Sequence, residues 1–271
     1  MRLAIAQFSA GMSKPANLER ISNLTARAAD AGAQVVVFPE GAMCDFGVAT
    51  DDLSGAAEPL DGRFIQTVSE LANRFGLTVV AGMFESIAGE KLIYNSAVVV
   101  DPAKGLVGTY RKRHLFDAFG ETESERFQRG DEDPLLVEIG GFKAAVVICY
   151  DIRFASFIER AADAGAELLL APAAWVAGPL KEEHLAVLAH ARALDNTMYV
   201  AVSGQTGPAY TGRSVIVDPL GATLAGLGDA EGVAIAEISR ERLKAARARL
   251  PVLAQRCAAM NARASAPASR R

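Results

Sequence analysis

Residues 143–153 read Lys-Ala-Ala-Val-Val-Ile-Cys-Tyr-Asp-Ile-Arg, an apolar run that ends on Cys149 and gives way at once to polar and charged residues. Apolar, β-branched runs of this kind are typical of strands that are covered on both faces, as they are in α/β folds. Ligands of open α/β sheets bind beyond the carboxyl ends of such strands. The stretch therefore predicts a buried strand that delivers a thiol to a binding site.

A second strand of the same kind ends on a carboxylate. Residues 33–40 read Ala-Gln-Val-Val-Val-Phe-Pro-Glu, and an apolar strand has no local reason to end on an uncompensated charge. We therefore interpret Cys149 as a candidate nucleophile and Glu40 as a candidate base, each at the end of a strand.

Helical and strand patterns alternate along the chain. Helices are predicted for residues 17–31, 65–75, 154–164 and 181–195, and strands for residues 2–8, 33–38, 77–84, 92–100, 106–110, 143–149, 167–171, 198–203, 213–218, 222–225 and 233–238. Because this order mixes crossover connections with hairpins, it predicts a layered α/β sandwich with mixed sheets.

The composition is that of a folded chain with one large core. Of its 271 residues, 51% are hydrophobic and 22% are charged, so we expect a single domain over residues 1–262. Residues 263–271 are small, polar and basic, which is typical of a disordered tail.

Charge and cysteine content exclude several classes of partner. The net charge is −4, whereas phosphate binding needs concentrated lysine and arginine, so we expect no nucleic-acid partner. The N-terminus lacks a signal-peptide pattern, and no apolar stretch reaches the ~20 residues that span a bilayer. The cysteines are too few and too widely spread for a disulfide framework or a metal pair. We expect a cytoplasmic protein with no membrane partner, no metal and no cofactor.

A lysine joins the candidate site at the start of a long loop. Residues 111–134 have mixed charge and no sustained period, and long loops in compact domains tend to be functional. A cysteine nucleophile needs a base or a nearby cation, so Glu40 would take its proton and Lys112 would stabilise the thiolate and an oxyanion. Alternatively, Cys149 is inert packing and Lys112 belongs to a solvated basic turn.

Three segments together resemble the nitrilase superfamily of carbon-nitrogen hydrolases. They are Val-Val-Phe-Pro-Glu40, Tyr110-Arg-Lys112-Arg-His-Leu-Phe116 and Ile148-Cys149-Tyr-Asp-Ile-Arg-Phe154, in the order of the family, and the resemblance covers nearly the whole chain. It implies a four-layer αββα sandwich with mixed sheets and a Glu-Lys-Cys triad formed by Glu40, Lys112 and Cys149.

The resemblance also implies a thioester mechanism. Glu40 would deprotonate Cys149, the thiolate would attack an amide carbonyl, and Lys112 with the backbone amide of Tyr150 would hold the oxyanion. Ammonia would leave, and water would then release the acid.

Many family members carry a second glutamate after the lysine. Here the spacing of Glu123-Ser124 to Gly130-Asp131 favours Glu123 over Glu121 and Glu125. Two acids near one thiol would titrate as a coupled set, so that one is ionised while the other donates a hydrogen bond. The alternative for Glu123 is an ordinary solvated loop charge.

Aromatic residues near these motifs are candidates for substrate binding. The resemblance implies that Trp175, in the run Ala171-Pro-Ala-Ala-Trp175, belongs to the pocket wall, although it could equally be core. Phe116 and Tyr150 are expected to line the same pocket. Asp151 and Arg153 would either fix the turn after Cys149 by an ion pair or meet substrate, and the structural role is favoured.

Within the superfamily, the motifs look most like ω-amidases and deaminated glutathione amidases. A small linear amide that bears a carboxylate is then the implied substrate, with an N-carbamoyl amino acid or a nitrile as alternatives for the same triad. A non-catalytic binding scaffold with this fold is disfavoured by the intact triad. The resemblance also implies a homodimer or larger homo-oligomer, and two-fold symmetry is the commonest oligomeric state in general.

Overall fold

The computed structural model describes residues 1–48 and 51–264, with side chains described up to residue 258. Its helices and strands follow one another in this order: β1 (Arg2–Gln7), α1 (Lys14–Asp30), β2 (Val35–Val37), α2 (Arg63–Phe75), β3 (Thr78–Glu85), β4 (Tyr94–Asp101), β5 (Gly105–Arg111), η1 (Glu123–Glu125), β6 (Leu135–Ile139), β7 (Phe142–Val146), η2 (Cys149–Arg153), α3 (Ala155–Asp163), β8 (Leu168–Ala173), α4 (Lys181–Asn196), β9 (Tyr199–Gly204), β10 (Val215–Val217), β11 (Thr223–Gly226), β12 (Gly232–Glu237), α5 (Arg240–Arg249) and α6 (Val252–Ala264). The elements η1 and η2 are short 3₁₀ helices.

The strands of the described part form two mixed sheets of similar design. The first has the order β12-β1-β2-β3-β4-β5 and the second the order β11-β10-β9-β8-β7-β6. In each sheet three central strands run parallel, namely β1, β2 and β3 in the first and β7, β8 and β9 in the second. The outer strands pair antiparallel with their neighbours.

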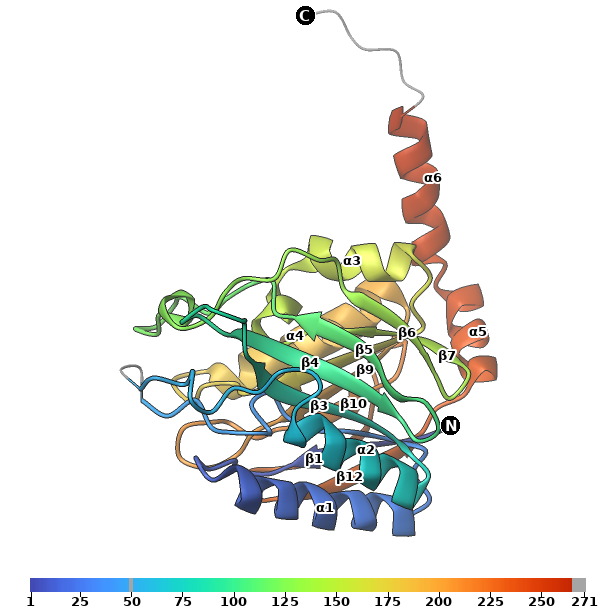
Figure 1. The fold of residues 1–271 in the computed structure, drawn as a ribbon. Helices are drawn as coiled ribbons and strands as arrows, with labels where there is room; N and C mark the ends of the chain where they lie inside the picture. Colours follow the sequence, from blue (N-terminus) through green and yellow to red (C-terminus); the bar gives the residue numbers. More distant parts are fainter. Residues whose placement is uncertain (49–50, 265–271) are drawn as a thin grey trace, which may run out of the picture.

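The two sheets pack face to face, and helices cover their outer faces (Figure 1). Along β1, Leu3 and Ile5 face the core shared by the two sheets, whereas Ala4 and Ala6 face the core beneath α1 and α2. This alternation follows from the two-residue period of a strand. Helices α3 and α4 pack on the second sheet, which makes four layers in the order α, β, β, α.

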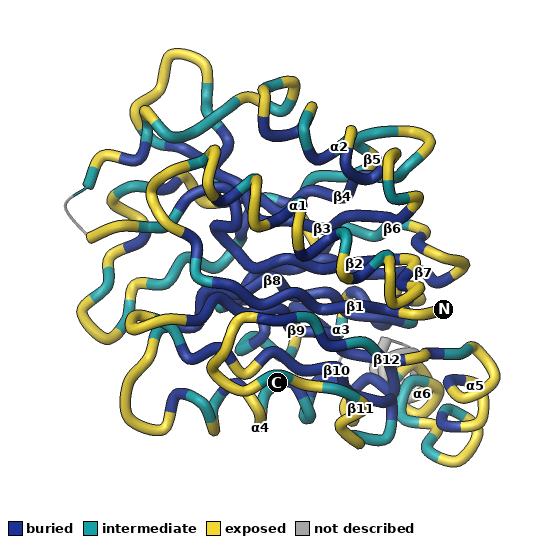
Figure 2. Tube along the Cα trace, turned by 90° about the horizontal axis from the view of Figure 1, so that it is seen from below, coloured by how far each residue is buried: buried dark blue, intermediate teal, exposed yellow. Residues whose placement is uncertain are grey.

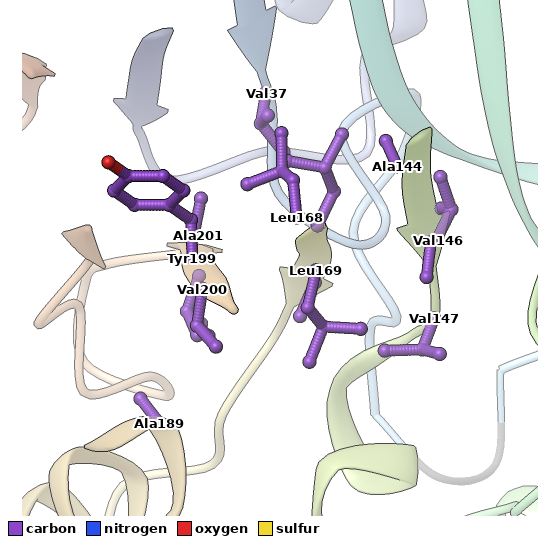
Figure 3. Packing of buried hydrophobic residues seen from close by; sticks show 14 of the residues in the cluster. Val37, Ala144, Val146, Val147, Leu168, Leu169, Ala189, Tyr199, Val200 and Ala201 are labelled. Atoms are coloured by element: carbon purple, nitrogen blue, oxygen red, sulfur yellow. The ribbon is translucent and has the colours of Figure 1, made fainter. Parts of the chain in front are cut away.

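The central strands of both sheets lie in the buried interior of the molecule, whereas the edge strands β5, β6 and β11 are partly exposed (Figure 2). Figure 3 shows the second sheet at close range: Leu168 of β8 lies beside Val37 of the first sheet, while Val200 of β9 lies on the side of Ala189 in α4. Both faces of the central strands β8 and β9 are therefore dry, as their apolar character predicts.

Most predicted elements agree with the structure to within a few residues, and the exceptions are as follows. The strand predicted to reach Cys149 stops at Val146, so the thiol lies in the turn η2 rather than in the sheet. Strand β6 and the helices α5 and α6 were not predicted. Of the predicted disordered tail, residues 263 and 264 end α6, and residues 265–271 lie outside the described residues. Among the helices that the structure describes, none is long and apolar enough to cross a membrane.

Candidate active site

The four predicted catalytic side chains come together at one cavity. Glu40 follows β2, Lys112 follows β5, Cys149 follows β7, and Glu123 lies in η1. All four line a cavity of about 120 Å³. Their exposed fractions are 1% for Glu40, 3% for Lys112, 6% for Glu123 and 7% for Cys149, so the cluster is shielded from solvent. This excludes a solvated basic turn for Lys112 and a solvated loop charge for Glu123.

The backbone around Glu40 is held by close contacts with neighbouring segments. The amide of Gly82 donates to the carbonyl of Pro39 at 3.1 Å, and a Cβ on Gly82 would come within 2.6 Å of the Glu40 Cα. Only glycine therefore fits at this position of β3. On the other side, the Gln205 side chain donates to the Glu40 carbonyl at 2.9 Å. The carboxylate is thus presented from a fixed segment.

Lys112 bridges the two glutamates. Its Nζ lies 2.8 Å from Oε1 of Glu40, 2.8 Å from Oε2 of Glu123 and 3.1 Å from Oε1 of Glu123. Burial by itself would lower the pKa of Lys112, but the charges of Glu123 and Glu40 raise that pKa well above its ordinary value. Lys112 is therefore a permanent cation.

Both carboxylates accept every hydrogen bond that they form in the described structure. Oε2 of Glu40 accepts from the amide of Ala174 at 2.7 Å, and Oε2 of Glu123 accepts from the amide of Phe116 at 2.6 Å. These donors suit two ionised carboxylates. The expectation that one acid donates a hydrogen bond therefore has no counterpart in these contacts.

Asn95 is a member of the cluster that the sequence analysis missed. Its Nδ2 donates to Oε1 of Glu40 at 2.7 Å and to Oε1 of Glu123 at 2.8 Å. Its backbone carbonyl also accepts from the amide of Lys112 at 2.8 Å. One residue of β4 thus contacts three of the four predicted catalytic residues. Its position in the run Tyr94-Asn-Ser96, at the start of a strand, carried no signal that could be separated from ordinary strand sequence.

The turn that carries Cys149 has an uncommon backbone. Cys149 has a positive φ of 44°, which is rare for a residue other than glycine and costs on the order of 1–3 kcal/mol. The fully buried Asp151 holds this turn, because its Oδ2 accepts from the Ile148 amide at 3.0 Å and from the Tyr110 hydroxyl at 2.8 Å. Its Oδ1 accepts from the His114 amide at 3.0 Å. Asp151 therefore fixes the turn after Cys149, as the favoured structural role predicts, but it forms no ion pair with Arg153.

The thiol of Cys149 is a weak acid in this environment. Burial raises its pKa well above the ordinary value, and the charge of Glu40 raises it further. Lys112 and the Ala174 amide act in the opposite direction and do not outweigh these effects. The thiol is consequently protonated at neutral pH, and attack on a substrate requires a base.

The three predicted substrate-binding residues also line the cavity. The rings of Phe116 and Tyr150 meet edge to face with centroids 5.0 Å apart. Trp175 is buried, and its Nε1 donates to the carbonyl of Lys181 at 2.9 Å, so it serves as both core and wall. Further lining residues are Phe46, Gly47, Glu121, Arg126, Ala174, Val176, Lys181, Ala209 and Tyr210.

Comparisons with known proteins agree with this geometry. A family model described as carbon-nitrogen hydrolase matches residues 2–248. A deaminated glutathione amidase of Escherichia coli O157:H7 is 36% identical, with 94% of this chain and 97% of that protein covered. An omega-amidase of Danio rerio is 34% identical over 94% of each chain. The crystal structure of Saccharomyces cerevisiae Nit3, a member of branch 10 of the nitrilase superfamily, matches with a TM-score of 0.82 and 28% identity, covering 93% of this chain and 94% of that chain.

Proposed function

The chain belongs to the carbon-nitrogen hydrolase family, and we propose that it hydrolyses a small linear amide through a thioester formed on Cys149. The resemblance to the nitrilase superfamily and its αββα fold is confirmed by these matches, and amide hydrolysis is the activity that the amidase relatives support. The observation that carries the proposal is the buried thiol beside a base and a cation in one cavity.

In the first half of the reaction, Glu40 takes the thiol proton as Sγ attacks the amide carbonyl. A negative charge develops on the carbonyl oxygen, and Lys112 is the permanent cation nearest to Glu40. The amide of Tyr150 is a second donor, because the first amides of a helix have no acceptor within that helix. The C–N bond then breaks, Glu40 returns the proton to nitrogen, and ammonia leaves.

In the second half, water replaces the amine. Glu40 is again a base, takes a proton from water, and the resulting hydroxide attacks the thioester carbonyl. The C–S bond breaks, the carboxylic acid leaves, and the proton on Glu40 returns to the sulfur. The same carboxylate thus alternates between base and acid, which its position between Lys112 and the thiol allows.

Glu123 supports this cycle through Lys112. Because Glu123 takes two contacts with the ammonium at 2.8 and 3.1 Å, Lys112 stays charged and oriented when Glu40 becomes protonated. If Glu40 were the only partner of Lys112, the ion pair of Lys112 would be lost whenever Glu40 is protonated. We therefore assign Glu123 a positioning role in the catalytic cluster.

The volume of the cavity favours a small substrate. A water needs on the order of 10–15 Å³ of such space, so a cavity of about 120 Å³ holds roughly 8 to 12 non-hydrogen atoms beside the thiol. Phe116, Tyr150 and Trp175 provide apolar walls for the chain of the amide. An N-carbamoyl amino acid or a nitrile would use the same nucleophile and is distinguished by which compound the protein consumes.

The test combines mass spectrometry with an ammonia assay. A panel of small amides, carbamoyl amino acids and nitriles is incubated with the protein. An acyl adduct on Cys149 that forms from an amide with release of ammonia, and then disappears as the carboxylic acid is released, supports the amidase. The Cys149→Ala variant should lose turnover, whereas Cys257→Ala, at an exposed thiol, is the matched control that retains it. A folded protein that forms neither adduct nor product with any of these compounds would indicate a binding scaffold.

We also propose a cytoplasmic homodimer, or a larger homo-oligomer, built from one domain over residues 1–262. A catalytic thiol must stay reduced, which favours the cytosol.

Both sheets contribute to one hydrophobic core, which favours a single folding unit. Val187 and Leu194 of α4 are exposed apolar residues one heptad apart, which favours a covered face. Light scattering of the purified chain tests the subunit number.

A further inference from the structure

Two loop segments beside the cavity expose apolar residues to solvent. Residues 118–120 read Ala-Phe-Gly and residues 177–180 read Ala-Gly-Pro-Leu, so neither segment carries a polar side chain. Phe119 is 74% exposed and Leu180 is 65% exposed. Surface loops are normally polar, and exposed apolar residues that gather in one place are typical of a binding surface. We call these two segments the apolar rim.

Both segments of the apolar rim adjoin the wall of the cavity. The ring of Phe119 is stacked on that of Phe116, which lines the cavity, with the ring centroids 6.3 Å apart. Lys181 lines the same cavity, and its Nζ lies 4.4 Å from the ring centroid of Phe119 and 4.9 Å from that of Phe116. Leu180 directly precedes Lys181 in the chain. The apolar rim therefore continues the cavity wall to the surface of the molecule.

The backbone of the apolar rim is held in an uncommon conformation. Phe119 and Leu180 each have a φ of 59°, in the left-handed region that bulky residues rarely adopt. Among the non-glycine residues that the structure describes, the others with a positive φ are Cys149, Thr197 and Arg213. Most of this small set thus lies at the nucleophile or on the apolar rim. Backbone conformations of this kind cluster at functional sites.

Leu180 is also an unfavourable residue for its position in the local structure. It is the N-cap of α4, where serine, threonine, aspartate and asparagine are preferred, and it forms no side-chain capping bond. An exposed leucine in a left-handed N-cap is therefore not explained by the stability of the helix. A role in binding accounts for an apolar side chain at this place.

The occupant of the apolar rim follows from the size of the cavity and the chemistry of its margin. The cavity holds roughly 8 to 12 non-hydrogen atoms, so a longer substrate must extend along its wall toward the surface. Lys181 is only 3% exposed, so the exposed surface beside it is the hydrocarbon of Phe119 and Leu180. Such a surface is covered favourably by an apolar group, because both surfaces then leave water.

We propose that the apolar rim binds a hydrocarbon or aryl group at the end of the substrate opposite the amide. The amide end would lie in the cavity beside Cys149, and the apolar end would lie on Phe119 and Leu180. This inference rests on the proposed amide hydrolysis and names a substrate class for it: linear amides that are longer than the cavity and end in an apolar group.

Asparagine is the replacement that changes the apolar rim with the least disturbance of the backbone. Phe119→Asn and Leu180→Asn each introduce a polar side chain that tolerates the left-handed conformation, and asparagine also suits the N-cap of α4. Leu224→Asn is the matched control, because Leu224 is an apolar residue of β11 that is 42% exposed and does not line the cavity. Thermal unfolding of each variant checks that the fold is retained.

The kinetic experiment compares three amides of the same chain length with different ends: hexanamide, 6-phenylhexanamide and adipamate. We expect the wild-type kcat/KM to be at least about tenfold higher for 6-phenylhexanamide than for hexanamide. This ratio should fall by about 5- to 20-fold in Phe119→Asn and by about 2- to 5-fold in Leu180→Asn, and Leu224→Asn should keep it. An unchanged ratio in both folded rim variants, or a higher wild-type kcat/KM for adipamate than for 6-phenylhexanamide, would overturn the proposal.

Binding without turnover separates this inference from the proposed function. The phenyl amide is titrated calorimetrically into Cys149→Ala and into Cys149→Ala combined with Phe119→Asn. If the wild-type protein hydrolyses none of the three amides, the proposed function fails for them, yet weaker binding by the double variant still supports the apolar rim. Equal affinity of the two proteins, or binding by neither, counts against it.

Light scattering tests whether a second copy of the chain covers the apolar rim instead. We expect Phe119→Asn and Leu180→Asn to have the same subunit number as the wild-type protein. A lower subunit number in either folded variant would make these segments an interface between copies and would overturn the assignment to substrate.

Discussion

The side-chain amide of Asn95 lies 2.7 Å from Oε1 of Glu40, inside a cluster of two carboxylates and one ammonium. The same nitrogen reaches Oε1 of Glu123 at 2.8 Å. The opposite orientation of the amide would bring three oxygen atoms together, so the two carboxylates fix which end of Asn95 faces them. Asn95 thereby keeps two like charges at a set separation without adding a charge of its own.

Replacing Asn95 should therefore affect turnover more than stability. We expect Asn95→Ala to lower kcat by about 10- to 100-fold, because Glu40 and Glu123 lose a shared donor and shift apart. Asn95→Asp should be more damaging, because it adds a third carboxylate to the cluster. Steady-state kinetics with urea unfolding measures both effects. If Asn95→Asp is as active as Asn95→Ala, repulsion within the cluster is not the cause.

The sequence was sufficient to predict the convergence of Glu40, Lys112 and Cys149. Glu40 and Cys149 were expected at the ends of apolar strands, beyond which α/β folds bind ligands, and the resemblance to the nitrilase superfamily implied that Lys112 joins them. Asn95 and Lys181 could not be predicted in the same way. The pairing of β4 with β5 places Asn95 beside Lys112, and the fold of a distant loop places the rings of Phe116 and Phe119 beside the ammonium of Lys181. Both arrangements depend on contacts between segments far apart in the sequence.

The errors in the predicted elements also have physical causes. Val147 and Ile148 are fully buried beyond the end of β7 at Val146, and the Val147 amide still donates to the carbonyl of Leu170 in β8 at 3.0 Å, so an apolar run does not reveal where a strand ends. Helix α5 buries only Leu243 and Ala246, and such a polar sequence carries little periodicity. Burial sets the hydrophobic pattern of a sequence, but that pattern marks neither the end of a buried strand nor a helix that is mostly exposed.

The turn of Cys149 should depend on the hydroxyl of Tyr110. Burial, and then the negative charge of Asp151, raise the pKa of Tyr110 far above its ordinary value, so the hydroxyl stays a donor at any working pH. Tyr110→Phe leaves Oδ2 of Asp151 with one donor fewer and should reduce the free energy of unfolding by about 1–3 kcal/mol. Urea titration measures this loss. Tyr94→Phe, on a half-buried tyrosine of β4, is the control, and an equal loss there would contradict the assigned role.

The absence of a side chain at Gly82 should be essential to the position of Glu40. A Cβ at residue 82 would meet the Glu40 Cα and the Gly41 amide nitrogen at 2.6 Å, and backbone atoms cannot move aside as a flexible side chain can. We expect Gly82→Ala to cost about 1–3 kcal/mol in stability and at least tenfold in kcat/KM. At Gly55, where an added Cβ meets nothing within 4 Å, the same change should be silent. A fully active Gly82→Ala enzyme would show that the segment can shift without consequence.

The charge of Glu40 should have opposite effects on the acidity of the thiol and on turnover. Because that charge raises the pKa of Cys149, Glu40→Gln should lower this pKa and increase the thiolate fraction at a given pH. Turnover should nevertheless fall by about 10²- to 10⁴-fold, because the variant has no base for the thiol or for water. The pH dependence of thiolate absorbance and of alkylation by iodoacetamide measures the first effect, and ammonia release measures the second. The sign follows from the charge: with Glu40 ionised, thiolate forms only as the pH rises through the raised pKa, and without it the midpoint moves down. If the midpoint moves up in Glu40→Gln, or if turnover is retained, Glu40 is not the base of this site.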